Sequence, residues 1–539
     1  MAKLEEAYPS GPTRSQLSRV KWYRRLWLWL WLAFSIGVPL IFGAYAAMRF
    51  LPDHADYYAN PEEHFKYGST GGERTVGFPF KIWQALPQVC REYLPAGMPA
   101  PEATPYAAFG MVYETNKELP IGVSKRRNLG IDRVFLNCGA CHTSTVRDSP
   151  QSVAKVYTGM PANTLDMLAF QTFFFNCSAD AKFSAEYLVP EIDRQMRSKN
   201  EKLSLIDRYV VYPVAIWIMR DRLLSLKNRF AWAQQQPQWG PGRVDTFNPG
   251  KAGYFNFPLA KLPEYEVQAP VDFPAVWNQR QKTGMHLHWD GNNGNVVERN
   301  KNAAFATGAT PPTIDLESIG RMEAWLKDVK QPAYPYAIDQ TKAAQGGKIY
   351  AEYCAACHGA NGQTFAAKEG LPQTECLKPG ESEDIYGPIV GKITRIEDIG
   401  TDRRRLDSFS YVLAVNMGTP YAGTPYKFCH YRKTFGYANM PLDGLWLRAP
   451  YLHNGSVPTL RDLFEVPDKR PKEFYRGNDV YNKEKVGFVS GVAEESGRKY
   501  FRFDTAIPGN GNRGHEGKSY GTELSEVEKD ALVEFLKTF

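Results

Sequence analysis

The sequence predicts a mainly α-helical, loop-rich protein in which two globular domains follow one N-terminal transmembrane helix. Three observations lead to this prediction: one apolar run long enough to cross a bilayer, two amphipathic helical patterns that each end a domain, and a five-residue motif that occurs twice. At 539 residues the chain is also too long for one ordinary hydrophobic core, because domains average roughly 150 residues.

The composition excludes wholesale disorder and gives no support for nucleic-acid binding. Apolar residues make up 43% of the chain and charged residues 23%, as in globular proteins. The formal net charge of +7 is small for this length and is spread along the chain, so we expect no nucleic-acid partner. Glycine (45) and proline (38) exceed their usual combined share, which indicates many loops and short helices.

Residues 26–48 form the only uncharged apolar run of spanning length. A helix of this length rises about 34 Å, enough for the hydrocarbon core of a bilayer. Tryptophans lie at one end of the run, where interfacial aromatic residues are favoured, and the preceding residues carry six basic against two acidic side chains. This bias holds residues 1–25 in the cytoplasm and sends the chain after Met48 into the periplasm.

The alternative interpretation of this run is a cleaved signal peptide, because Ala44-Tyr45-Ala46 resembles a small-residue cleavage site. The run is longer than the usual apolar core of a signal peptide, which favours a single-pass anchor in the bacterial inner membrane. With either interpretation the bulk of the chain is exported.

Two helical patterns divide the exported part. Apolar residues recur at helical spacing from Ile319 to Val329, and a proline-containing linker, 331–340, follows. These features predict an N-terminal domain over 49–330 and a C-terminal domain over 341–539.

The second pattern lies at the C-terminus. Ser525 and Glu528 form a predicted capping box, which opens a helix over 525–538 with an apolar stripe.

The duplicated motif is C-x-x-C-H, the attachment signal for c-type haem. Its copies are Cys138-Gly-Ala-Cys141-His142 and Cys354-Ala-Ala-Cys357-His358. The two thiols add to the haem vinyl groups, and the histidine binds the iron as the proximal ligand. A redox dithiol or a zinc half-site leaves the histidine unexplained. We therefore predict two covalently bound haem c groups, with iron on His142 and His358.

The residues before the second motif support a cytochrome fold. Gly346 and Gly347 lie on a predicted helix that leads into Cys354. Small residues there would allow the C-terminal helix to cross closely above it, an arrangement that resembles the class I cytochrome c fold.

Four further cysteines remain. If they form disulfides, the spacing favours one pair in each domain, Cys90 with Cys177 and Cys376 with Cys429; free buried thiols are the alternative.

The sixth ligand of each iron decides the function. Two strong axial ligands make an electron carrier, whereas an open face makes a site for peroxide or dioxygen. In the C-terminal domain the candidate ligands are Met440, His453, His430 and His515. In the N-terminal domain, His286, His288 and Trp289 crowd into a few positions, which favours a functional role.

A longer set of residues carries a resemblance to a known superfamily. Trp289-Asp290-Gly291 lies between the two motifs, and GLWLRAPYLHNGSVPTLRDLF (444–464) follows the second. With the two haem motifs, these segments resemble the bacterial dihaem cytochrome c peroxidases, which are related to MauG and to the haem-dependent rubber oxygenases. The long segment between the motifs is most similar to the rubber oxygenase branch.

The resemblance implies a role for each site residue. The haem on His142 would be reactive, and the haem on His358 would be six-coordinate and relay electrons. Trp289 would be the electron bridge. His515 resembles the distal ligand of the second haem, with Met440 as the second choice.

The resemblance also implies partners and a further cofactor. The partners would be a periplasmic electron-donor cytochrome or cupredoxin, and the oxidant would be hydrogen peroxide or dioxygen. Calcium is a further expected cofactor, and His453 would order its loop or a propionate.

Three features depart from the superfamily pattern. His288 precedes Trp289 where an oxygenase pocket would have an apolar neighbour; it would either ligate the first iron at rest or act in acid–base catalysis. Glu298 is a second acid–base candidate, with a surface salt bridge to Arg299 or Lys301 as the alternative. The membrane anchor, finally, makes a bulky extracellular polymer a poor substrate.

These expectations combine into a periplasmic dihaem oxidoreductase that reduces hydrogen peroxide at the N-terminal haem. An oxygenase of an apolar organic substrate is the alternative enzyme, and a two-haem electron carrier is the alternative without catalysis.

Overall fold

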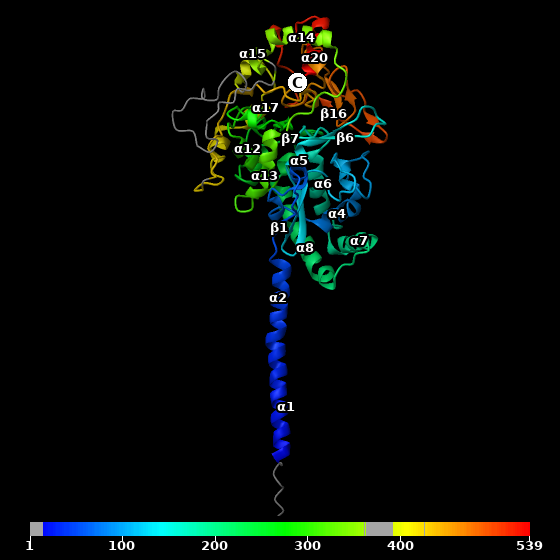
Figure 1. Cartoon of the computed structure of the whole chain (residues 1–539), viewed down its shortest axis with the longest axis vertical. Coiled ribbons are helices and arrows are strands. Elements are labelled where there is room, and N and C mark those ends of the chain that lie inside the picture. Colours follow the sequence, from blue (N-terminus) through cyan, green and yellow to red (C-terminus); the bar gives the residue numbers. More distant parts are fainter. Residues whose placement is uncertain (1–13, 361, 363–391, 425) are drawn as a thin grey trace, which may run out of the picture. The chain divides into compact units, whose positions relative to one another are not determined.

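The computed structural model describes residues 14–360, 362, 392–424 and 426–539, and Figure 1 shows its elements. The chain divides into two compact units: residues up to His54 with 127–131, and residues 55–126 with 132–539, here called the main unit. The division does not fall in the predicted linker 331–340. The two predicted haem domains both lie within the main unit, and their separation stays a prediction.

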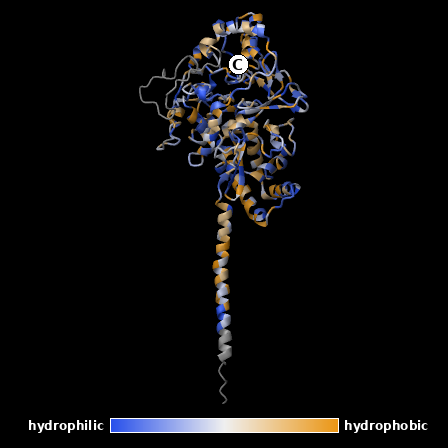
Figure 2. Cartoon of the chain, viewed as in Figure 1, coloured by the Kyte–Doolittle hydropathy of each residue, from blue (hydrophilic) through white to orange (hydrophobic). Residues whose placement is uncertain are grey.

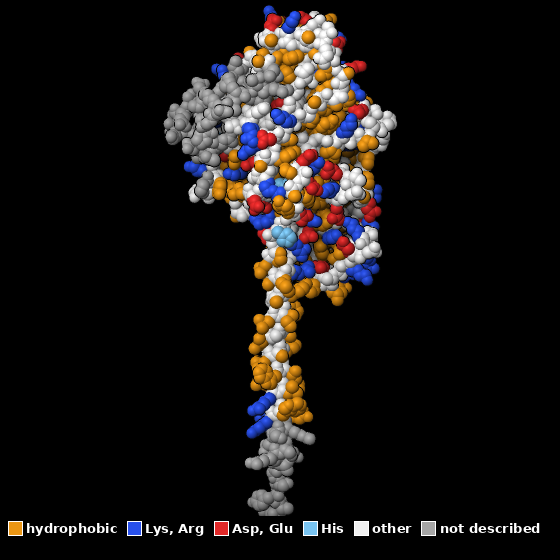
Figure 3. Space-filling model, viewed as in Figure 1, with side chains coloured by type: hydrophobic (Ala, Val, Ile, Leu, Met, Phe, Trp, Pro, Cys, Tyr) orange, Lys and Arg blue, Asp and Glu red, His pale blue; other side chains and the backbone are white. Residues whose placement is uncertain are grey.

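The N-terminal unit contains a long apolar helix, as expected. It comprises α1 (Arg14–Leu32), a π-helical turn η1 (Ala33–Gly37) and α2 (Val38–Phe50). The stretch Lys21–Phe50 contains 18 consecutive residues with a mean hydropathy of 1.9, none of them buried by the protein, and it carries apolar side chains on its surface (Figures 2 and 3). Its length and composition suit a membrane span, although a signal sequence has the same properties.

The main unit is mainly helical and rich in loops, as the composition indicates. Its first helices are α3 (Pro61–Tyr67), α4 (Phe80–Val89), α5 (Cys138–Cys141), α6 (Met167–Ala179), α7 (Ala185–Ser198), α8 (Tyr212–Arg229), α9 (Ala231–Gln234), α10 (Asn248–Gly253), α11 (Glu264–Val267), α12 (Val296–Ala306) and α13 (Leu316–Asp328). The later helices are α14 (Gln340–Tyr353), α15 (Ala355–His358), α16 (Ile396–Ile399), α17 (Arg404–Ser408), α18 (Tyr411–Asn416), α19 (Leu460–Leu463) and α20 (Glu526–Leu536).

The strands are short. They are β1 (His54–Ala55), β2 (Phe78–Pro79), β3 (Val123–Asn128), β4 (Ile131–Leu136), β5 (Thr143–Val146), β6 (Lys155–Thr158), β7 (Arg243–Asp245), β8 (Pro270–Asp272), β9 (Ile393–Arg395), β10 (Gly436–Ala438), β11 (Glu473–Arg476), β12 (Tyr481–Asn482), β13 (Gly487–Phe488), β14 (Glu494–Glu495), β15 (Arg498–Lys499) and β16 (Phe501–Asp504). Two antiparallel pairs position the site: β7 pairs with β8, and β9 pairs with β10.

The two helices predicted to end domains are present. In α13, Ile319, Met322 and Leu326 are buried, as the helical spacing predicts. At the start of α20, Ser525 and Glu528 form the predicted capping box, in which each side chain binds the backbone of the other residue.

The close crossing of α14 and α20 explains the glycines before the second motif. A Cβ atom on Gly346 would lie 1.9 Å from the carbonyl oxygen of Ala531, and one on Gly347 would lie 3.2 Å from the ring of Phe535. Only glycine therefore fits at 346, and the predicted cytochrome-like crossing is confirmed.

The block 444–464 lies in the same core. Trp446, Leu447 and Leu460 are buried with Tyr350 of α14 and Leu532 of α20. This packing ties the block 444–464 to the helix pair beside the second motif.

The predicted disulfide of the N-terminal half is present. Cys90 and Cys177 are bonded, with Cα atoms 5.6 Å apart, at the end of α4 and on α6. Cys429 is also disulfide-bonded, and its predicted partner Cys376 lies outside the described residues.

Candidate haem sites

The first C-x-x-C-H motif is formed by the turn after β4. Asn137 caps α5, because its Oδ1 accepts from the backbone N–H of Gly139 at 2.9 Å while its Nδ2 donates to Gly68 O at 2.8 Å. Gly122 packs so tightly on the motif that a Cβ atom there would lie 2.1 Å from the nitrogen of Ala140. These contacts hold Cys138 and Cys141 on one helical turn.

His142 has the orientation that an iron ligand requires. Its Nδ1 lies 2.8 Å from the backbone oxygen of Pro274, and a carbonyl oxygen only accepts, so Nδ1 donates and Nε2 keeps its lone pair. Burial lowers the pKa of His142 to about 4, with a smaller contribution from Arg299, and the ring is therefore neutral at pH 7.

The second motif reproduces this arrangement with other residues. His358, at the end of α15, places its Nδ1 2.8 Å from the backbone oxygen of Met440, so its Nε2 is also left with a lone pair. Burial lowers the pKa of His358 as well.

This contact gives Met440 a role other than the predicted one. Its backbone oxygen supports the ring of His358 at Nδ1. The contact involves only the backbone of Met440, so the side chain as the second-choice distal ligand stays a prediction.

The four motif thiols are not bonded to one another and are poorly suited to redox exchange. Burial raises the pKa of Cys138 to about 11 and those of Cys141 and Cys354 to about 12, and it also raises the pKa of Cys357. Dithiol redox motifs need a lowered thiol pKa, which these cysteines lack.

The donor set fits covalent haem at both motifs. Each has two unbonded thiols on one turn and a neutral histidine with a free Nε2. Cys138, Cys141 and His142 are each partly buried, and Cys138 and Cys141 pack against the hydrophobic core of the main unit.

His515 faces the second motif. Burial, with His358 as the next contributor, lowers the pKa of His515 to about 3, so the two imidazoles are close in space. The Nδ1 atom of His515 has no hydrogen-bond partner among the described residues, and its ring lies 4.8 Å from that of Tyr520. A neutral, enclosed histidine opposite His358 suits a distal ligand.

Arg470 builds the turn that presents His515. Its buried guanidinium donates to the carbonyl oxygens of Asn512 (2.6 Å), Gly514 (2.9 Å) and His515 (3.1 Å). At Gly514, where φ is +88°, a Cβ atom would lie 2.4 Å from the nitrogen of Thr401. The His515 backbone, with φ of +51°, is thus held by contacts that a free loop would not make.

Trp289 joins the supports of the two proximal histidines. Its Nε1 donates to the Asp272 oxygen at 2.9 Å, two residues before Pro274, and its own backbone oxygen accepts from Ala438 N at 2.9 Å, two residues before Met440. Trp289 is therefore hydrogen-bonded to the segments that support both histidines, and its role as the electron bridge stays a prediction.

The neighbours of Trp289 are held by ion pairs. The carboxylate of Asp290 is fully buried and accepts from Nε and Nη2 of Arg405 at 3.1 and 2.9 Å. The carboxylate of Asp272 accepts from Arg476 at 2.8 Å. These ion pairs therefore hold the residue that follows Trp289 and the residue whose carbonyl accepts from its Nε1.

Arg299 connects His288 with the first motif. The positive charge of Arg299 acts to lower the pKa of His142, of His288 and of Cys138. Arg299 therefore lies near all three side chains. Burial lowers the pKa of Arg299 itself to about 10. Within the described chain, the one hydrogen bond of its guanidinium is to Asn300 Oδ1, at 3.3 Å.

His288 is a neutral base in this region. Burial, followed by the charge of Arg405, lowers its pKa to about 4. Its Nδ1 lies 2.6 Å from Asn292 Oδ1, which leaves Nε2 as the proton acceptor. Tyr431 stacks on the ring with centroids 6.3 Å apart, and the Tyr431 hydroxyl has no partner among the described residues.

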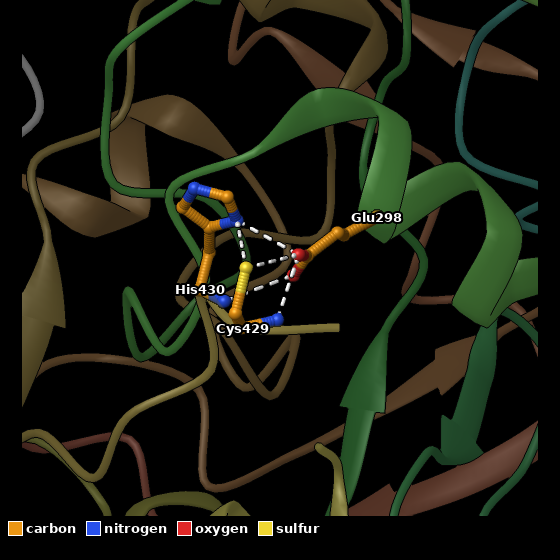
Figure 4. Close-up of side chains that lie close together, drawn as sticks. All are labelled: Glu298, Cys429 and His430. Carbon is orange, nitrogen blue, oxygen red and sulfur yellow. Dashed lines mark hydrogen bonds and ion pairs between the residues drawn. The ribbon is translucent and has the colours of Figure 1, made fainter. Parts of the chain in front are cut away.

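Glu298 differs from both expectations for it. It is neither free for acid–base chemistry nor on the surface in a salt bridge with Arg299 or Lys301. Its buried carboxylate accepts from the backbone N–H groups of Cys429 (2.8 Å) and His430 (3.1 Å) and pairs with His430 Nδ1 at 2.7 Å (Figure 4). Glu298 therefore fixes the chain before Tyr431.

The cluster in Figure 4 does not suit a metal ion. Glu298, Cys429 and His430 have metal-type side chains within 4.8 Å of one another, but the sulfur of Cys429 is in a disulfide and is not a thiolate. Calcium prefers oxygen ligands, so this cluster does not supply the expected calcium site, which stays a prediction.

His453 orders its loop, one of the roles considered for it. Its backbone oxygen accepts from Asp272 N at 2.9 Å, and its Nε2 lies 3.1 Å from the hydroxyl of Tyr437.

Sequence reasoning missed Pro274, Arg299, Tyr431 and Arg470 as site residues. Arg299 was considered only as a surface ion-pair partner of Glu298. The others belong to no sequence motif. The two carbonyls that orient the proximal histidines are backbone groups, which every residue has, so the amino-acid sequence does not reveal them.

Comparisons with known proteins agree with a cytochrome-type oxidoreductase. The relative y4iJ of Sinorhizobium fredii, named an uncharacterized protein, is 26% identical over 87% of this chain and 89% of its own length. A second, y4iM of the same organism, also named uncharacterized, is 29% identical over 50% of this chain and 64% of its own length. A family model described as RoxA-like, cytochrome c-like matches residues 436–476, which include Met440 and His453. The C-terminal part of this chain thus contains a RoxA-like, cytochrome c-like domain, which supports haem c binding and oxidoreductase activity in general.

Proposed function

We propose that the chain is an exported, membrane-anchored oxidoreductase that holds two haem c groups and reduces hydrogen peroxide at the group on Cys138, Cys141 and His142. The observation that carries the proposal is the paired arrangement of two histidines, each supported by a carbonyl that lies two residues from a hydrogen-bond partner of Trp289. A lone carrier haem would need neither the second site nor the bridge.

Haem supplies an iron that binds peroxide and passes electrons to it. The residues of the chain then supply the proton chemistry. Nε2 of His288 takes the proton from one peroxide oxygen and delivers it to the other, which leaves as water when the O–O bond breaks. Arg299 stabilises negative charge on the leaving oxygen. Two electrons and two protons complete the conversion of one peroxide to two water molecules.

Peroxide is favoured over an apolar substrate by the ionisable groups gathered around Arg299. The charge of Arg299 acts on His142 and Cys138 and also on His288 and Tyr431, and such groups suit proton transfer to peroxide better than binding of an apolar organic molecule.

The second site supplies electrons. His358 and His515, which lie close together, would both bind that haem, and two strong axial ligands favour electron transfer over reaction with oxygen species. Trp289 passes the charge between the sites, and a periplasmic cytochrome or cupredoxin is the proposed donor.

The test is a stopped-flow reaction of the fully reduced holoprotein with peroxide. We expect both haems to be oxidised by one equivalent, since two electrons are needed. His142→Ala should abolish the reaction and leave the spectrum of the second haem intact, whereas His358→Ala should leave peroxide binding at the first haem. Full activity in His142→Ala would overturn the assignment.

A second candidate function is oxygenation of an apolar organic compound, which the RoxA-like match at 436–476 favours. An oxygenase would incorporate oxygen atoms from dioxygen into an organic product, and it would do so without added peroxide. A protein that consumes peroxide but incorporates no labelled dioxygen is a peroxidase.

A further inference from the structure

The first part of α8 and the turn before it expose an unusually apolar surface. The side chains that lie more than two-fifths exposed there are Leu205, Ile206, Tyr209, Val210, Val214 and Trp217. Residues 209–219 contain no charged side chain, and the opposite face of the helix, with Tyr212, Ile216 and Met219, packs into the core of the main unit. Figure 3 shows hydrophobic side chains at the surface where Figure 1 places α8.

A helix that is apolar on all sides is normally covered on all sides. The exposed positions recur every three to four residues, so they form one stripe along the helix rather than scattered contacts. Trp217 is 70% exposed and Tyr209 is 71% exposed, and such residues are the ones favoured at a membrane–water interface. Nothing in the described chain covers this stripe.

We infer that this stripe, which we call the α8 face, docks onto the lipid bilayer that holds the N-terminal helix. The inference rests on the proposed anchor. The apolar helix ends at Phe50 and the main unit begins at Ala55, and the intervening four residues reach at most about 14 Å when extended. A unit tethered so closely meets the bilayer surface at a high effective concentration, so a modest apolar face is sufficient to dock it.

The charges at the ends of the stripe agree with a bilayer as the occupant. Arg208 and Arg220 border the uncharged stretch, each beside an acidic residue (Asp207 and Asp221), and Lys202 is exposed before it, while the middle has no charge that a bilayer would exclude. This order, with charged residues at the edge and aromatic and branched apolar residues in the centre, suits a helix that lies in a membrane interface. Docking would also fix the height of the two haem sites above the membrane.

The test uses the full holoprotein with a protease site inserted between Leu51 and His54, reconstituted into vesicles of phosphatidylethanolamine and phosphatidylglycerol. After cleavage the vesicles are floated, and the released main unit is measured by its haem absorbance. We expect the main unit to stay with the vesicles and Val210→Ser/Val214→Ser/Trp217→Ser to lower the bound fraction at least tenfold.

The matched control is Tyr411→Ser/Val412→Ser/Val415→Ser, which removes three exposed apolar side chains from α18 and should leave binding unchanged. Haem content and spectra show that each variant is folded. Complete release of the cleaved wild-type unit would overturn the inference, as would equal loss of binding in the α18 variant. Self-association of the cleaved unit without vesicles, abolished by the α8 variant, would assign the face to a second copy instead. If the uncleaved protein does not float with the vesicles, the proposed membrane anchor is wrong. That result leaves the α8 face to be judged separately, by the binding of the cleaved main unit.

Discussion

Single side chains divide the chemistry of this protein between two sites. His142 and His358 are prepared for iron in the same way, by a backbone carbonyl that takes the Nδ1 proton. The other neighbours of the two histidines differ: His515 lies close to His358, whereas Arg299 acts on His142 and also on His288. In the proposed function, these few residues distinguish the closed site from the reactive one.

The lowered pKa of His288 predicts an unusual pH profile. A base acts while it is unprotonated, and burial lowers its pKa from the ordinary value near 6.5 to about 4. The rate of the first reaction with peroxide should be constant from pH 8 to about pH 5 and fall below that with a midpoint near 4. His288→Gln should slow the reaction by about 10²–10⁴-fold and abolish this midpoint. A midpoint near 6.5 in the wild type would exclude His288 as the base.

The hydrogen bonds of Trp289 predict a specific defect in electron transfer. Trp289→Phe keeps an aromatic ring but removes the Nε1 donor to Asp272. Transfer between the haems should slow by at least tenfold in flash photolysis, with haem content unchanged. If transfer keeps its wild-type rate, Trp289 is only a packing residue.

Short elements place these side chains, and much of their placement is non-local. The motifs and α20 could be predicted because covalent attachment, helical spacing and capping act over a few residues. Pro274 follows β8 and Met440 follows β10, far in sequence from the histidines that they support. No local pattern reports such pairings, so the sequence could suggest the proposed iron ligands but not what orients them.

The turn 512–515 shows how an element serves a ligand and predicts the effect of losing its support. Arg470→Ala removes the donors to the carbonyl oxygens of this turn, and His515 should then no longer hold the second iron. The second haem should become high-spin in its optical spectrum, as in His515→Ala.

Arg502→Ala is the matched control, because Arg502 forms an exposed ion pair with Glu473 and does not contact the turn. It should leave the spectrum unchanged. A low-spin second haem in Arg470→Ala would show that the turn holds its shape without Arg470.

The whole molecule combines an apolar N-terminal helix with one compact unit that contains both motifs. The predicted helix, the helical character and one disulfide could be read from the sequence because each depends on local composition or on few alternatives. The predicted domain boundary does not appear as a division of the main unit, since the block 444–464 and residues of the N-terminal half, such as Met160 and Trp277, share one core. Segments distant in sequence therefore build the sites together.

The central claim is that the haem on His142 keeps a face open while the haem on His358 is closed by His515. Electron paramagnetic resonance of the resting ferric holoprotein, followed by titration with hydrogen peroxide, tests it most directly. One high-spin and one low-spin signal of equal intensity are predicted, with peroxide changing the high-spin signal first. Two low-spin signals that do not respond to peroxide would contradict the claim and identify the protein as an electron carrier.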